Sequence, residues 1–463
     1  MIRRMLILGA TGDLTFRYIL ADLAQLREAG RLPEGFRISA LARDDLDTGS
    51  YRAHAKERLG RHAAAVSEEA RSGLAEAIEY HRADVTDPER VRAALAQACG
   101  EPVVAYLALP PFVFARAIEA LKKVGLAEGS RVVVEKPFGE NLETARDLNR
   151  LLHEAYPEEA VFRVDHFLGL QTVQNVLGLR FANRVFEPVW NHDHVERVEI
   201  VWDETLALEG RAGYYDTAGA LKDMIQNHLL QLLYLVGMEP PITLHEHDLR
   251  DRKVDLLRAV RRLSPEEAGR LSVRARYAAG RVRGQEIPAY AEEEGIEPDR
   301  QTETFAEVTL FVDNWRWSGV PFVLRTGKAM ARDRAEISVR FKPVPHFAFG
   351  QKTQPDPNVL RLGLDPDRIV LGVEINGPGD PFDLEHVELG TELTPQEIPA
   401  YGRLLLAVLE GDPTLSIRAD EAEQSWRIVE PILQAWERGA VPLLEYPAGS
   451  DGPASRTQPA GGG

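Results

Sequence analysis

The first third of the chain alternates short apolar runs with segments of helical pattern, and this alternation constrains the fold more than any other feature. The apolar runs MLILGA, FRISALAR, VVAYLALP and VVVEKPFG have the length and composition of buried strands. Between them lie LTFRYILADLAQLREAG and a helical pattern that extends to about residue 80. Strands that alternate with helices form βαβ units with parallel strands. We therefore expect a mostly parallel, doubly wound sheet.

From about residue 190 the pattern changes to longer runs in which apolar and polar residues alternate. Examples are HVERVEIVWDE, TFAEVTLFVDNW, AEISVRFKP, RIVLGVEI and DLEHVELG. Such runs are typical of strands with one buried face and one face toward solvent or a partner. We predict one large sheet, preceded by a helical region that contains RVDHFLGLQTVQN and YYDTAGALKDMIQNHLLQLLYLV. The final GSDGPASRTQPAGGG is rich in Gly, Pro and Ser and is expected to be disordered.

Composition limits the partners of this 463-residue chain, whose length suggests two or three domains. No apolar run approaches twenty residues, so we expect neither a membrane span nor a signal peptide. The formal net charge of −17 argues against nucleic acid or an anionic membrane as a partner. The single cysteine, Cys99, excludes a disulfide framework within the chain and a cysteine-built metal cluster. We therefore expect a cytoplasmic protein without a bound metal.

The segment GATGDLT, residues 9–15, lies between the first predicted strand and the first amphipathic helix. Gly9 and Gly12 let the backbone turn tightly, which brings amide groups at the helix start close to a pyrophosphate. A tight connection without a ligand explains such a turn equally well. The end of the second predicted strand favours a dinucleotide, because Arg43 suits a phosphate on the ribose, whereas Asp44 suits a free hydroxyl. NADP is the preferred coenzyme, and NAD remains the alternative.

Other polar residues indicate a crevice with an acid–base centre. Lys136 follows the strand VVVE and projects into the predicted crevice, although a lysine at this position is also commonly a solvated strand end. In the helical run KDMIQNHLLQLL, Asp223 and His228 are five positions apart, so they border a common pocket without stacking on one helix face. Together with the doublet Asp165-His166, they suggest an imidazole base oriented by a carboxylate.

A series of motifs along the chain resembles those of the glucose-6-phosphate dehydrogenase family, in order, over residues 5–446. The motifs are GATGDLT, ALAR, YLALPP, VVVEKPFG, RVDHFLG with VQN and LRFAN, EGRAGYYD, DMIQNHLLQ, MEPP and VPFVLRTGKA. The resemblance implies an α/β plus α+β fold. It places a Rossmann-like dinucleotide-binding domain at residues 1–165 and a larger α+β domain with an extended, mainly antiparallel sheet at 166–446, before a disordered tail at 447–463. The second domain would bind substrate and form homodimers or homotetramers.

The same resemblance implies the reaction and a role for each matching residue. A hexose is oxidised at its anomeric carbon to a lactone, and the hydride passes to NADP. His228 is the general base, Asp165 orients it, and Lys136 reaches both substrate and coenzyme. The residues implied to bind the sugar are His166, Glu204, Asp223 and Lys328. The residues implied to bind the coenzyme are Gly9, Thr11, Gly12, Leu14, Arg17, Arg43, Tyr106, Lys136 and Pro137.

The sequence departs from the family's pattern where the substrate phosphate is bound. In the family the Asp-His doublet is commonly followed by an aromatic residue, Leu, Gly and Lys, but this chain has Phe167, without a hydroxyl, and Leu170 at the lysine position. After RTGK, where another basic residue is usual, it has Asp333 between Arg332 and Arg334. Loss of basic groups weakens dianion binding, because each charge-assisted contact contributes about 1.5–3 kcal/mol.

Three hypotheses remain open on the sequence alone. The first is a dehydrogenase of glucose 6-phosphate in which Arg332, Arg334 or another basic group compensates. The second keeps the chemistry but acts on a hexose without the phosphate, or with an amino substituent, where Asp333 would pair with a cation or with sugar hydroxyls. The third is a noncatalytic homologue that binds or regulates. The intact set of reacting residues weighs against the third.

Overall fold

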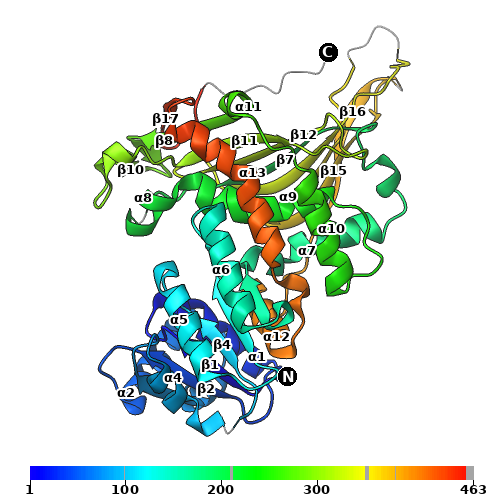
Figure 1. Ribbon diagram of the computed structural model, residues 1–463. Coiled ribbons are helices and arrows are strands. Elements are labelled where there is room, and N and C mark those ends of the chain that lie inside the picture. Colours follow the sequence, from blue (N-terminus) through cyan, green and yellow to red (C-terminus); the bar gives the residue numbers. More distant parts are fainter. Residues whose placement is uncertain (99, 209–211, 350–353, 381, 455–463) are drawn as a thin grey trace. The chain divides into compact units, whose positions relative to one another are not determined.

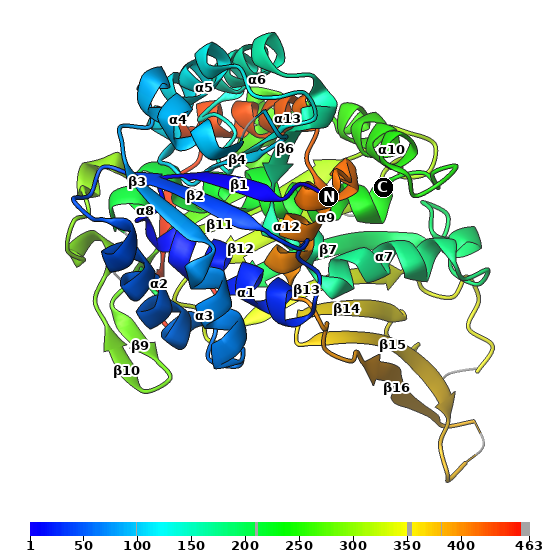
Figure 2. The same cartoon turned by 90° about the horizontal axis from the view of Figure 1, so that it is seen from below.

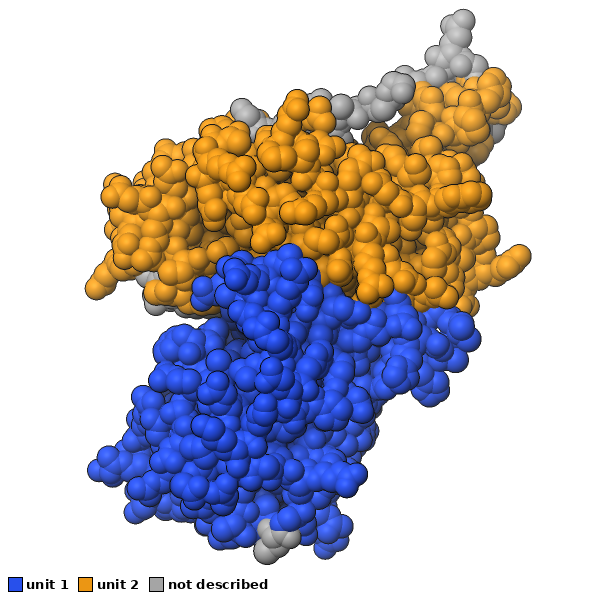
Figure 3. Space-filling view, viewed as in Figure 1, with its two compact units in different colours: residues 1–170, 241–251, 396–423 blue, residues 171–240, 252–395, 424–463 orange. Residues whose placement is uncertain are grey.

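The computed structural model describes residues 1–98, 100–208, 212–349, 354–380 and 382–454 (Figure 1). The chain forms two compact units, which Figure 3 colours separately. Unit 1 consists of Met1–Leu170, Pro241–Asp251 and Gln396–Glu423, and unit 2 consists of Gln171–Pro240, Arg252–Pro395 and Gln424–Gly463. The expected boundary after residue 165 therefore needs correction, because two later segments return to the first unit. Within the described residues, no helix combines the length and apolarity that crossing a bilayer requires.

Unit 1 contains the expected parallel sheet, with six strands in the order β3-β2-β1-β4-β5-β6. Every neighbouring pair is parallel. The strands are β1 Arg4–Leu8, β2 Arg37–Ala42, β3 Ile78–Arg82, β4 Val104–Leu107, β5 Arg131–Glu135 and β6 Val161–Val164. The sequence pattern missed β3 and β6, because IEYHR is mostly polar and VFRV lies within the region expected to be helical. The strand order reverses between β1 and β4, where a doubly wound sheet opens a crevice beyond its carboxyl ends.

Helices cover both faces of this sheet (Figure 2). The helices α1, α2, α3 and α12 lie on one face, and α4, α5 and α6 lie on the other. Their bounds are α1 Leu20–Glu28, α2 Thr48–His62, α3 Glu68–Glu76, α4 Pro88–Ala94, α5 Pro111–Val124, α6 Leu142–Ala155 and α12 Ala400–Glu410. A π-helical turn, Thr15–Ile19, precedes α1. Apolar residues of α12 join the core that α1, α2 and the sheet form, so this late segment completes the first unit.

Unit 2 is built on a nine-stranded sheet in the order β16-β15-β14-β13-β7-β12-β11-β8-β17, and a separate hairpin pairs β9 with β10. All pairs in the large sheet are antiparallel except β7–β12 and β8–β17, which confirms the expected mainly antiparallel sheet. The strands are β7 Val195–Asp203, β8 Ser272–Ala278, β9 Gly280–Val282, β10 Gln285–Ile287, β11 Phe305–Phe311, β12 Pro321–Gly327, β13 Arg334–Phe341, β14 Val359–Asp365, β15 Asp367–Asn376, β16 Leu384–Glu392 and β17 Leu443–Pro447.

The expected helical run around residue 225 is present in unit 2, but it is not one regular α-helix. It consists of α8 Ala212–Ala220, a π-helix Leu221–Leu229 and α9 Leu230–Gly237, with a break at Gly219. The other helices are α7 Gln171–Phe181 and α11 Pro265–Leu271, together with α10 Glu246–Ala259 and α13 Ala419–Glu437, which include residues of both units. Short 3₁₀ helices span Ala96–Ala98, Glu158–Ala160, His166–Gly169, Glu187–Val189, Tyr290–Glu292, Pro298–Arg300 and Pro413–Leu415.

The C-terminal segment differs from the expected disordered tail at 447–463. Pro447 ends β17, and the next residue, Ala448, is buried. The Gly449 amide donates to the carbonyl oxygen of Ala329 at 2.8 Å. These contacts hold the chain beyond residue 447 against the sheet of unit 2. The remaining residues of the expected tail, 455–463, and Cys99 lie outside the described residues.

Candidate active site

The first turn of unit 1 requires glycine. Gly9 has φ +92°, and a Cβ atom there would lie 2.1 Å from the carbonyl oxygen of Ala108. The Gly12 amide donates to the carbonyl oxygen of Gly9 at 3.1 Å, and the Tyr51 hydroxyl donates to that of Ala10 at 2.6 Å. Only a residue without a side chain allows the backbone at position 9 to lie so close to Ala108, so the segment GATGDLT forms the predicted tight turn at the carboxyl end of β1.

The two charged residues that the sequence analysis singled out, Arg43 and Asp44, follow the end of β2. The Arg43 side chain is 68% exposed and forms an ion pair of 2.9 Å with Asp84. The next residue, Asp44, accepts a hydrogen bond of 2.6 Å from the Thr11 hydroxyl, which ties the end of β2 to the glycine turn. Asp44 is therefore engaged within the protein, while the guanidinium of Arg43 is open to solvent.

A cavity of about 600 Å³ lies wholly within unit 1, at the carboxyl ends of its central strands. We call it the unit 1 cavity. Its lining residues are Leu14, Arg17, Tyr18, Asp22, Gln25, Leu109, Glu135, Lys136, Val164, Asp165, His166, Pro399, Ala400 and Tyr401. Five of the residues predicted from the sequence are thus brought together: Leu14, Arg17, Lys136, Asp165 and His166. The peptide bond that joins Lys136 to Pro137 is cis.

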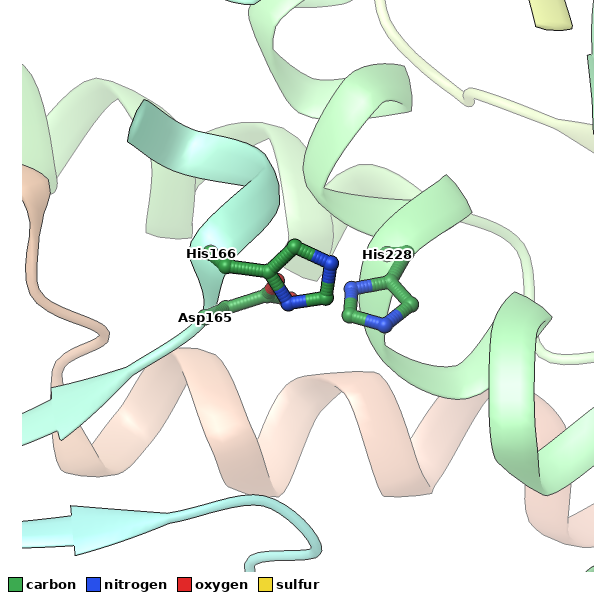
Figure 4. A group of neighbouring side chains, drawn as sticks. All are labelled: Asp165, His166 and His228. Atoms are coloured by element: carbon green, nitrogen blue, oxygen red, sulfur yellow. The ribbon is translucent and has the colours of Figure 1, made fainter. Parts of the chain in front are cut away.

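Asp165 and His166 follow β6 directly, and Figure 4 shows both side chains on that connection. Asp165 is 1% exposed, and its Oδ1 accepts the Phe167 amide at 3.0 Å, which starts the short helix His166–Gly169. His166 is exposed, and its ring meets the Phe167 ring edge to face. A Cβ atom at Gly169 would lie 2.2 Å from the carbonyl oxygen of Ala400, so this segment packs tightly against the start of α12.

Tyr106 does not line the unit 1 cavity, although the resemblance implied a coenzyme contact. Its hydroxyl is buried and forms hydrogen bonds with Glu135 and with the hydroxyl of Tyr401. Tyr401 also donates to Glu135, and both of these partners do line the cavity. Sequence reasoning missed them. The position of Glu135 immediately before Lys136 was an available signal, whereas nothing in the sequence links Tyr401 to this strand end.

In unit 2 the residues implied to bind the sugar form a cluster because two parallel strands end side by side. β7 and β12 pair with Asp203 opposite Gly327, so the following residues, Glu204 and Lys328, are neighbours. Lys328 Nζ lies 2.7 Å from Glu204 Oε2 and 5.2 Å from the ring centroid of Tyr215.

The buried Tyr215 links this pair to the third predicted residue. Burial raises the pKa of Tyr215, and the negative charges of Asp223 and Glu303 raise it further. Glu204 and Lys328 are therefore grouped beside this aromatic side chain, and Asp223 influences it through its charge. The sequence analysis did not single out Tyr215.

His228 is 1% exposed and lies on the π-helix of unit 2, as Figure 4 shows. In a π-helix the hydrogen bonds connect residues five apart, so Asp223 and His228 are separated by little more than one turn. The expectation that they border a common pocket without stacking on one face stays a prediction. His228 belongs to unit 2 and Asp165 to unit 1.

The residues at the implied phosphate positions have structural partners. The Asp333 carboxylate accepts the Thr205 amide at 2.7 Å and pairs with Arg283 at 2.5 Å. Arg334 pairs with Glu336 at 2.7 Å, whereas Arg332 is exposed. Asp333 thus holds the segment that follows Glu204, and the guanidinium of Arg334 is engaged with an acid.

Comparison with known proteins places this arrangement in one family. Residues 6–175 match the family model described as "Glucose-6-phosphate dehydrogenase, NAD binding domain", and residues 177–460 match "Glucose-6-phosphate dehydrogenase, C-terminal domain". The chain belongs to the glucose-6-phosphate dehydrogenase family. Both parts of the family's architecture, the dinucleotide-binding sheet and the larger second sheet, are present in the structure.

Individual relatives in this family match the chain over nearly its whole length. The Glucose-6-phosphate 1-dehydrogenase of Treponema pallidum (strain Nichols) is 40% identical over 97% of this chain and 92% of the relative. A crystal structure of Glucose-6-phosphate 1-dehydrogenase from Mycobacterium avium has a TM-score of 0.85 at 35% identity, covering 98% of this chain and 96% of that one. A structure titled "Glucose-6-phosphate dehydrogenase in complex with its substrate glucose-6-phosphate" has a TM-score of 0.88 at 31% identity, with the same coverage.

Proposed function

We propose that this protein is a dehydrogenase that oxidises glucose 6-phosphate at its anomeric carbon to the lactone and transfers the hydride to NADP. The observation that carries this proposal is the near-full-length match to glucose-6-phosphate 1-dehydrogenases, combined with an unbroken set of polar residues at the predicted positions. A homologue without catalysis would have no chemical need for the carboxylate, imidazole and ammonium groups together. The noncatalytic hypothesis is therefore the weakest of the three.

The features of unit 1 fit a dinucleotide with a 2′-phosphate. Gly9 lets the turn after β1 pack against the backbone of Ala108, and the amide groups of this turn, at the start of a helix, would bind a pyrophosphate. Arg43 is exposed at the end of β2, where it would bind the 2′-phosphate, while Asp44 is engaged by Thr11. These features support NADP over NAD.

The residues divide the chemistry between them. When bound, the coenzyme would accept the hydride that leaves the anomeric carbon. His228 would take the proton of the anomeric hydroxyl on an imidazole nitrogen, so that the oxygen forms the carbonyl of the lactone. Asp165 would orient this imidazole and stabilise the imidazolium, a pairing that joins residues of different units and stays a proposal. Lys136 would contact both the sugar and the coenzyme and so keep the anomeric carbon close to the nicotinamide ring, which is a near-attack geometry.

In unit 2, Glu204, Asp223 and Lys328 would bind sugar hydroxyls, and His166 of unit 1 would face the substrate. The ion pair between Lys328 and Glu204 keeps both groups in place before a ligand arrives. Preorganised polar groups of this kind lower the ordering cost of binding.

A second candidate function is the same oxidation of a hexose without the phosphate or with an amino group. It is favoured by Leu170 and Asp333 at implied phosphate positions and by the engagement of Arg334 with Glu336. Asp333 itself is already bound by Thr205 and Arg283, so it is a poor candidate for a direct sugar contact. The choice therefore depends on whether Arg17, Arg332 or His166 supplies the missing positive charge.

A spectrophotometric screen separates the candidates. Hexoses, hexose phosphates and amino sugars are each tested with NADP and with NAD, and the reduced coenzyme is followed. We expect glucose 6-phosphate with NADP to be the best pair, and Leu170→Lys to lower its Michaelis constant, because the lysine adds a phosphate contact. Faster oxidation of an unphosphorylated or amino hexose would instead select the second function. Coenzyme binding without reduction by any sugar would select the noncatalytic homologue.

The assembly and location of the protein are part of the same proposal. We propose a cytoplasmic homodimer or homotetramer, on the basis of family resemblance and the single cysteine. The outer strand β16 carries mostly exposed side chains, which suits a contact between subunits. Light scattering of the purified protein measures the oligomer size directly.

A further inference from the structure

Glu135 is an acidic residue in the wall of the unit 1 cavity, directly beside Lys136. It ends β5, and its Oε1 accepts hydrogen bonds from two tyrosine hydroxyls. One donor, Tyr106, lies on the neighbouring strand β4, and the other, Tyr401, lies on α12. Two elements that are remote in sequence therefore hold this carboxylate in one position at the cavity wall.

The two tyrosines act as neutral donors. Burial raises the pKa of Tyr106 and of Tyr401 well above the ordinary value, and the negative charge of Glu135 raises both further. Burial and the negative charge of Asp165 raise the pKa of Glu135, while the two hydroxyl donors and Lys136 oppose this increase. The hydroxyls thus stabilise the ionised carboxylate without competing for its charge.

The strand order indicates which half of a dinucleotide would face Glu135. In a doubly wound sheet the two halves of the ligand lie on opposite sides of the switch point, which is between β1 and β4 in unit 1. Arg43 at the end of β2 belongs to the side that would bind the adenosine half. The nicotinamide half would then face the ends of β4 and β5, where Glu135 lies.

We propose that Glu135 makes the protein bind the oxidised coenzyme in preference to the reduced one. This inference rests on the proposed binding of NADP. The oxidised nicotinamide ring carries a positive charge and the reduced ring carries none, so a carboxylate in the wall attracts only the oxidised form. In a partly buried wall this attraction is stronger than in water. The consequence is capture of the oxidised coenzyme and easier release of the reduced product.

The test is a pair of dissociation constants, for NADP and for NADPH, measured by titration calorimetry at pH 8 without sugar. Glu135→Gln keeps the size of the side chain and an oxygen acceptor but removes the charge. We expect it to weaken NADP binding about tenfold and NADPH binding less than twofold. Asp22→Asn removes an acid of the same cavity that lies on α1 and not at the strand ends that would face the nicotinamide ring, so it should leave the ratio of the two constants unchanged.

Several outcomes would overturn the proposal. These are an equal effect of Glu135→Gln on both coenzymes, no effect on either, or an equal change of the ratio in Asp22→Asn. If Glu135→Gln does not fold, Tyr401→Phe decides, because with one donor lost the carboxylate is no longer held in its position at the wall, which should weaken NADP binding about threefold more than NADPH binding. An unchanged ratio in that variant would also overturn it. Failure of the unaltered protein to bind either coenzyme would refute the proposed function instead.

Discussion

Lys328 and Glu204 are far apart in sequence, yet their charged atoms are 2.7 Å apart, because each follows one of two paired parallel strands. Lys328 is 16% exposed in its side chain, and the ring of Tyr215 covers its ammonium group. An ammonium held between a carboxylate and an aromatic face is positioned before substrate binds. At the scale of single residues, the cluster in unit 2 is therefore a preorganised polar site.

The role of His228 is testable at the same scale. His228→Asn removes the proposed base but keeps a polar side chain, so kcat should fall about 10³-fold while the Michaelis constant for the sugar changes little. His62→Asn, on the exposed end of α2, is the matched control and should leave both constants unchanged. Steady-state kinetics with glucose 6-phosphate and NADP measure both. A kcat equal to that of the unaltered protein would remove His228 from this role.

At the scale of elements, the start of the π-helix Leu221–Leu229 is capped by Glu303, which lies just before β11. Glu303 is 8% exposed, and its Oε1 accepts the Leu221 amide at 3.0 Å, which caps the helix start. Gly219 has φ +69°, and a Cβ atom there would lie 2.4 Å from this oxygen. The cap therefore requires glycine at the break, and it places the helix that carries Asp223 and His228.

The pH dependence of stability tests this cap. Burial raises the pKa of Glu303 from 4.5 to about 7, although Leu221, Arg274 and Lys222 oppose the increase. Between these two values the folded protein keeps a proton that the unfolded chain has lost, so the stability from Glu303 falls as pH rises through this window. Glu303→Gln keeps an oxygen acceptor without titrating.

The free energy of unfolding of this variant minus that of the unaltered protein should therefore increase between pH 4.5 and about pH 7, and stay level above. The increase is at most about 3 kcal/mol. Urea titrations at several pH values measure it. A difference that does not depend on pH would show that Glu303 does not titrate in this range.

At the scale of the molecule, unit 1 is assembled from three separate segments, and Glu158 connects them. Its Oε1 lies 2.9 Å from Arg163 Nη1, 3.2 Å from Arg250 Nη2 and 3.0 Å from the Ala419 amide. The Arg163 side chain is fully buried, and that of Arg250 is 5% exposed. One carboxylate thus joins β6 to both returning segments, 241–251 and 396–423.

Neutralising this carboxylate should destabilise unit 1. Glu158→Gln removes the nearest anion of two buried guanidinium groups and leaves Arg250 only the longer contact of 3.9 Å with Glu421, so we expect the free energy of unfolding to fall by about 3 kcal/mol. Glu57→Gln disrupts the exposed pair with Arg61 and should change it by less than about 1 kcal/mol. Urea unfolding followed by circular dichroism measures both variants. Similar small effects would mean that the buried network does not hold the segments together.

The family, the parallel and antiparallel sheets and the glycine turn at Gly9 could be predicted from the sequence. Each leaves a pattern in neighbouring residues: apolar runs of strand length, alternation of apolar and polar residues along a strand, or a glycine turn between a strand and a helix. The residues Leu14, Arg17, Lys136, Asp165 and His166 were also predicted. Lys136 was predicted from the strand end that it follows, Asp165 and His166 as an acid–imidazole doublet, and Leu14 and Arg17 from the resemblance to the family. Their specific roles remain predictions.

Tertiary structure decided the features that depend on segments remote in sequence. The strand β3 was missed because its residues are largely polar, and its place in the sheet comes from pairing with β2. Tyr401 forms a hydrogen bond with Glu135 because a late segment of the chain packs against the first sheet. Glu303 accepts the Leu221 amide because the segment before β11 packs beside the start of the π-helix. The sequence by itself thus determined the local elements and the family, since periodicity and turn chemistry are local. Only the folded chain shows which residues contact Glu135, Asp333 and the π-helix, because contacts between remote segments leave no pattern in neighbouring residues.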